Sequence, residues 1–150
     1  GWGEVHLTET TMPTTAFWLE YTENIADLAS LNLSRVSEAL HGLANALRHV
    51  APIRVMCDPT DIRALAMLRS PFLLNPTIYL YESYPGGIGI SEKLYNHAEH
   101  LLEAAIALLS ACGCREGCPS CIGPALETGS HGKHGALTLA RIALMKEIGS

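Results

Sequence analysis

Apolar residues first alternate with polar ones and later recur at helical spacing along this chain. Glu4 to Thr8 alternates, and Thr14 to Thr22 is rich in β-branched and aromatic residues, so we expect a strand in each. Thr77 to Glu82 is apolar on both faces and is expected to be a central strand. Ile62 to Leu68 fits either a strand or a short helix.

Three stretches carry the apolar stripe of an amphipathic helix. The first starts after a cap at Thr22 or Ser34 and ends before Pro52. The second, capped by Ser91, covers residues 91–110 without interruption, and the third covers Ala136 to Ile148. The pattern predicts an α+β fold in which three to five mostly antiparallel strands pack with three main helices.

Four of the five cysteines lie within ten residues, and a metal site is the strongest interpretation of this density. They are Cys112, Cys114, Cys118 and Cys121. Zn²⁺ accepts four thiolates at about 2.3 Å, and a site with four protein ligands has no open position for water. We therefore expect one structural zinc ion that staples the fold, and we expect Cys57 to remain outside the site as a free thiol.

Other interpretations of the cysteines explain less. Disulfides are disfavoured because the count is odd and the N-terminus shows no secretory signal. Buried small hydrophobes would account for one or two of the cysteines but not for four so close together. His131 or His134 would be able to replace one cysteine as a ligand, although four thiolates already complete the site.

The overall composition limits the classes of function. With 150 residues and 48% hydrophobic content, we expect one domain over 1–150, and Gly1 at the start suggests a piece of a longer protein. No apolar run reaches the length of about 20 residues that a membrane span needs, so we expect no membrane partner and a cytoplasmic location. The formal charge of −5 and ten scattered Lys and Arg residues predict weak non-specific DNA binding.

Several further residues invite a chemical interpretation. Asp58 and Asp61 with a histidine suggest a hydrolase, but aspartate before Pro59 more commonly caps a turn. The glycine-rich stretch 84–89 lacks a nucleotide-binding motif, and we expect its glycines to lead a strand closely into the next helix. Four further histidines are expected to have structural or solvent-exposed roles: His41, His49, His97 and His100.

The second half of the chain resembles the zinc-binding C-terminal domain of MrfA-like (YprA-like) DEAD/DEAH-box helicases. The resemblance covers Ile78 to Gly89, a long helix, and the Cys-x-Cys-x₃-Cys-x₂-Cys block. Upstream, residues 39–41, Pro52 and Cys57 to Asp61 are also similar to this family, and Lys133 lies near its usual lysine after the zinc block. Glu82 departs from the family pattern, since an aspartate is expected there.

The resemblance implies an accessory domain of a superfamily-two, ATP-dependent DNA helicase that acts in DNA repair. Its partners would be the motor domains in the same polypeptide and, through them, DNA. ATP and Mg²⁺ would bind only in that motor, because this chain has no Gly-x-x-x-x-Gly-Lys-Ser/Thr motif. The domain would brace the motor and guide single-stranded DNA; a protein-interaction module that recruits repair partners is the alternative.

Overall fold

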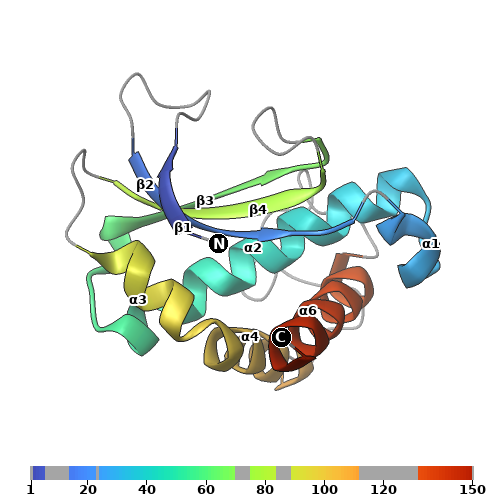
Figure 1. The fold of residues 1–150 in the computed structure, drawn as a ribbon. Helices are drawn as coiled ribbons and strands as arrows, with labels where there is room; N and C mark the ends of the chain where they lie inside the picture. Colours follow the sequence, from blue (N-terminus) through green and yellow to red (C-terminus); the bar gives the residue numbers. More distant parts are fainter. Residues whose placement is uncertain are drawn as a thin grey trace.

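An antiparallel sheet forms one layer of the molecule, and the long helices cover one of its faces (Figure 1). The computed structural model describes residues 2–5, 14–22, 24–69, 75–83, 89–111 and 132–149. The strands are β1 (Trp2–Val5), β2 (Thr14–Glu20), β3 (Ile62–Met67) and β4 (Thr77–Glu82), in the order β1-β2-β4-β3. All pairings are antiparallel. All six residues of β4 are buried, which confirms its prediction as a central strand.

The helices in the described residues run between and after these strands. They are α1 (Ile25–Ala29), α2 (Leu33–Val55), the short 3₁₀ helix η1 (Pro59–Asp61), α3 (Ile90–Asn96), α4 (Ala98–Ala111) and α6 (Gly132–Gly149). The predicted α+β class is confirmed, and Ile62 to Leu68 is resolved as a strand. None of these helices combines the length and hydropathy that a bilayer-spanning segment needs.

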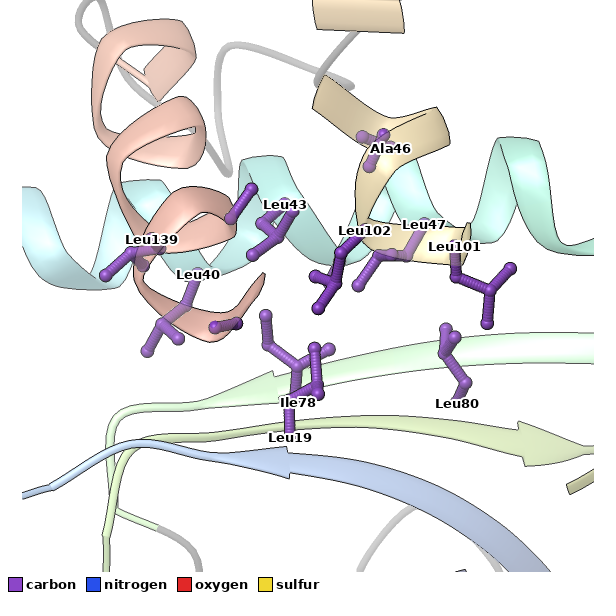
Figure 2. Close-up of a cluster of buried hydrophobic side chains, with 14 of the residues drawn as sticks. Leu19, Leu40, Leu43, Ala46, Leu47, Ile78, Leu80, Leu101, Leu102 and Leu139 are labelled. Carbon is purple, nitrogen blue, oxygen red and sulfur yellow. The ribbon is translucent and has the colours of Figure 1, made fainter. Parts of the chain in front are cut away.

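One large hydrophobic cluster joins the sheet to the helices. Figure 2 shows it: Leu19 of β2 and Ile78 and Leu80 of β4 point toward the leucines of α2, α4 and α6. The helical members that the figure labels are Leu40, Leu43, Ala46, Leu47, Leu101, Leu102 and Leu139. Each fully buried leucine contributes about 1.5–3 kcal/mol, so this cluster fixes the position of all three long helices. A smaller cluster around Tyr79 lies on the other sheet face.

Helix α2 differs from its prediction at both ends. It begins after Asn32, whose side chain accepts a hydrogen bond from the Arg35 backbone N–H at 2.9 Å. It also continues through Pro52 to Val55. Proline removes one helical N–H donor, but Pro52 is buried, as are Ala51 before it and Val55 at the end of the helix. We attribute the continuation to this burial, which offsets one lost hydrogen bond near the end of the helix.

The single helix predicted for residues 91–110 is wrong, because the chain breaks at His97 into α3 and α4. The apolar stripe nevertheless continues across the break, since Leu94, Ala98 and Leu101 are all buried. The predicted cap at Ser91 is also wrong. Gly89 occupies the N-cap position with a φ of 86°, a backbone conformation that glycine adopts without strain, and Ser91 lies inside the helix.

Candidate functional site

The four predicted zinc ligands lie in segment 112–131, outside the described residues. The flanking helices are described: α4 ends at Ala111, directly before Cys112, and α6 begins at Gly132. Both helices pack against each other and against α2. The segment that carries the cysteines therefore connects two helices of the hydrophobic core. His131 also lies outside the described residues, whereas His134 is exposed in the first turn of α6.

The residues from Cys57 to Asp61 form a capped turn. The Asp58 carboxylate accepts hydrogen bonds from the Thr60 backbone N–H at 2.8 Å and from the Thr60 hydroxyl at 2.7 Å. These bonds favour the ionised form and lower the pKa of the Asp58 carboxyl. The expected capping role is confirmed. No group of three His, Cys, Asp or Glu side chains in the described residues is arranged to hold a metal ion.

Cys57 precedes this turn and is half-buried. Burial raises the pKa of its thiol, and the negative charges of Asp61 and Asp58 raise it further. A thiol in such surroundings is a poor nucleophile, because the thiolate is the reactive form. Cys57 forms no disulfide within the described residues, and its position outside the zinc site stays a prediction.

The four histidines with no expected metal role have structural or exposed positions. The Nδ1 atom of His41 lies 2.8 Å from the Ser37 carbonyl oxygen, and that of His49 lies 2.8 Å from the Asn45 carbonyl oxygen. Since a carbonyl oxygen only accepts, each Nδ1 carries the proton. His97 and His100 are both exposed, with ring centroids 6.1 Å apart.

Glu82 ends β4 and is only 4% exposed. The Ser91 hydroxyl of α3 donates a hydrogen bond to its Oε2 atom at 3.1 Å. This contact spans the glycine-rich stretch 84–89 and holds the end of β4 to the start of α3. The described residues thus give Glu82 a structural role, and they explain why a serine occupies the second position of α3.

A pocket of about 470 Å³ lies between α2 and the edge strand β3. Its polar lining comes from His41, Asn45 and Arg48 on one stripe of α2, Thr60 of η1 and Arg63 of β3. The two upstream segments that carry the family resemblance, 39–41 and 57–61, therefore meet here. The sequence carries no signal for this pocket, because Arg48 and Arg63 belong to different elements and look dispersed along the chain.

Comparisons with known proteins place the chain in one family. Residues 43–122, more than half of the chain, match the family model of the MrfA Zn-binding domain. The uncharacterized ATP-dependent helicase YprA of Bacillus subtilis is 38% identical over 127 residues, which are 85% of this chain and 17% of YprA. The chain thus spans about a sixth of that relative.

Two further relatives differ in length. A crystal structure of the DUF1998 helicase MrfA bound to DNA superposes with a TM-score of 0.75 at 34% identity, covering 91% of this chain and 18% of MrfA. An uncharacterized protein of Methanocaldococcus jannaschii is 31% identical over 86 residues, which are 55% of this chain but 77% of that protein. By the family model and by these similarities in sequence and fold, the chain belongs to the MrfA Zn-binding domain family.

Proposed function

We propose that this chain is a structural zinc-binding accessory domain, residues 1–150, of an ATP-dependent DNA helicase. The observation that carries the proposal is the match to a helicase domain over most of the chain, in both sequence and fold. The motor would lie elsewhere in the same polypeptide and would bind ATP and Mg²⁺. A role in DNA repair and in guiding single-stranded DNA belongs to the same proposal.

Cys112, Cys114, Cys118 and Cys121 would hold the zinc ion. Four thiolates suit Zn²⁺ chemically, and the zinc in the family's description supports this donor set. The ion would fix the connection between α4 and α6. Because metal binding contributes folding free energy, of about 10 kcal/mol or more in zinc-finger peptides, its loss would loosen both helices. The domain would then no longer brace the motor.

The test compares wild-type and Cys118→Ser forms of the full-length protein. Zinc content, ATPase activity and strand separation are measured for each. We expect the variant to lose zinc and strand separation but to keep ATP binding and part of its ATPase activity, because the nucleotide site would lie in another domain. A variant that lacks zinc and still unwinds DNA at the wild-type rate would refute the bracing role.

A protein-interaction module is the second candidate function. It is favoured by the Methanocaldococcus jannaschii relative, because the matched region makes up most of that protein. A domain that recurs in a short protein can act without a motor in the same chain. The outcome just described, zinc loss without loss of unwinding, would favour this second function.

A further inference from the structure

The pocket between α2 and β3 gathers positive charge in an otherwise acidic chain. Arg48 extends from α2 and Arg63 from β3, and both side chains are exposed. Neither guanidinium has an ion-pair or hydrogen-bond partner within the part of the chain that the structure describes. Among the residues that the structure describes, no Asp or Glu lines the pocket. The carboxylate nearest to Arg63 in sequence belongs to Asp61, which is not among the pocket residues, and that of Asp58 is hydrogen-bonded to Thr60.

The two arginines reach the pocket from opposite sides of the sheet. Ile62 and Ala66 belong to the cluster beneath α2, whereas Leu65 and Met67 pack in the cluster on the other sheet face. Because side chains alternate along a strand, Arg63 lies on the face away from α2. Arg48 and Arg63 therefore flank the edge of β3, and a group bound there can contact both.

Backbone donors of β3 lie along the same edge. The Ser83 N–H donates to the Asp61 carbonyl oxygen at 3.0 Å, and Arg63 pairs with Tyr81 in the same register. In an antiparallel pair, the alternate residues direct their N–H and C=O groups away from the partner strand. Ala64 and Ala66 therefore present theirs to the free edge, since β3 pairs only with β4 in the described residues.

Two unpaired guanidinium groups beside outward backbone N–H groups suit an anion with several oxygens. Arginine binds phosphate with charge-assisted hydrogen bonds, and backbone N–H groups commonly contact nucleic-acid phosphates. The pocket volume of about 470 Å³ lies within the usual range of ligand sites, about 300–1,000 Å³. The pocket is partly open to solvent, so it can hold one phosphate of a longer chain.

We propose that this pocket binds a backbone phosphate of a single-stranded nucleic acid, held between Arg48 and Arg63 at the edge of β3. The inference rests on the proposed function and identifies where this domain would contact the strand. Because the chain is acidic overall, binding is expected to be weak, within the range of about 10⁻⁶ to 10⁻⁴ M typical of non-specific sites.

The test measures binding of a fluorescent oligothymidine of about 15 nucleotides to the zinc-loaded 150-residue chain by fluorescence anisotropy. Arg48→Ala and Arg63→Ala are compared with Arg54→Ala, which removes an exposed arginine from the same helix α2 but outside the pocket. We expect each pocket variant to weaken binding about five- to tenfold and to reduce the salt slope by about 0.7. Arg54→Ala should weaken it less than about twofold.

Competitors distinguish the possible ligands. Unlabelled oligothymidine should displace the probe at micromolar concentration, whereas inorganic phosphate should require millimolar concentration because it makes one contact instead of several. If inorganic phosphate displaces the probe at the same concentration as oligothymidine, the pocket binds a free anion and the proposed nucleic-acid ligand is wrong. An oligoglutamate peptide is the second competitor. If it binds more tightly than the oligonucleotide and depends on the same arginines, the ligand is an acidic protein segment and the proposed nucleic-acid ligand is wrong.

Two other outcomes would reject the pocket itself. One is an equal effect of all three arginine variants, which would indicate general charge. The other is no effect of the pocket variants, with folding verified by circular dichroism. Neither result would bear on the bracing role, because the Cys118→Ser comparison of zinc and strand separation leaves both arginines in place.

Discussion

Gly135 of α6 packs directly against Ala39 of α2. A Cβ atom added to Gly135 would lie 2.7 Å from the Ala39 Cβ atom, which is too close for two carbon atoms without a shift of the helices. In most helices, replacing glycine by alanine stabilises by about 0.5–1 kcal/mol. Here we expect Gly135→Ala to destabilise by about 1–3 kcal/mol, because the added methyl group overpacks the contact. Chemical denaturation of both proteins measures the difference.

The partner residue supplies the control. Ala39→Gly removes the atom that the new methyl group would meet, so the double variant should be more stable than the sum of the two single effects predicts. A double-mutant cycle gives this interaction free energy. Simple additivity would show that the helices adjust without cost, and the close contact would then have no energetic role.

A second prediction concerns the buried contact between Ser91 and Glu82. Ser91→Ala removes a hydroxyl donor from a carboxylate that is 4% exposed. The loss of a donor to a buried group costs about 1–3 kcal/mol, so the midpoint of denaturant unfolding should fall. Ser83→Ala is the matched control, since the Ser83 hydroxyl donates to the Thr60 carbonyl oxygen in an exposed position. If the two substitutions lower the unfolding midpoint equally, the burial of Glu82 adds no cost to the loss of its hydrogen-bond donor.

Much of the fold can be predicted from the sequence, because buried positions place apolar residues at the spacing of a strand or a helix. The strands at 14–22 and 77–82 were predictable from β-branched and apolar residues, and so were the cores of α2 and α6. The break at His97 was not, because Leu94, Ala98 and Leu101 keep one stripe across it. The extension of α2 through Pro52 was not predictable either, because proline usually ends a helix and only the tertiary packing shows that this segment is buried.

The candidate sites differ in how far sequence reveals them. Zinc ligands occur close together because short spacers let them converge on one ion, so the cysteine block is evident without coordinates; its ligand assignment remains a prediction. The pocket between α2 and β3 joins residues that only the packing of a helix beside an edge strand brings together. Scattered cations in a sequence therefore do not exclude a local site for an anion.

A third prediction follows from Tyr21, which links the sheet layer to α6. Its hydroxyl donates to the Leu139 carbonyl oxygen at 2.9 Å, and the residue is buried. Burial raises the pKa of Tyr21 well above its ordinary value of 10.0. The folded state therefore favours the neutral phenol. This contribution to stability is complete below pH 10 and decreases as the pH rises above it.

Tyr21→Phe tests this linkage. At pH 7 we expect a cost of about 0.5–1.5 kcal/mol for the lost hydrogen bond. Above pH 10 the difference from wild type should shrink, because phenylalanine has no proton to lose. Unfolding free energies at several alkaline pH values measure it, and Tyr95→Phe is the control because Tyr95 is 46% exposed. If the difference in unfolding free energy between wild type and Tyr21→Phe is the same at all pH values, the pKa of Tyr21 is not raised by folding.

The last prediction separates Cys57 from the zinc ligands. Cys57→Ser should leave one zinc ion per chain by elemental analysis, whereas Cys118→Ser should abolish zinc binding.

In the wild-type protein, Cys57 should react slowly with iodoacetamide at pH 7, since burial and the charges of Asp61 and Asp58 raise the pKa of its thiol. Asp61→Asn removes one of these charges, so the pKa should fall and alkylation should become faster. Mass spectrometry of the peptide that contains Cys57 measures both rates. If Cys57→Ser loses zinc, the fifth cysteine is a ligand and the assignment of the other four must be revised.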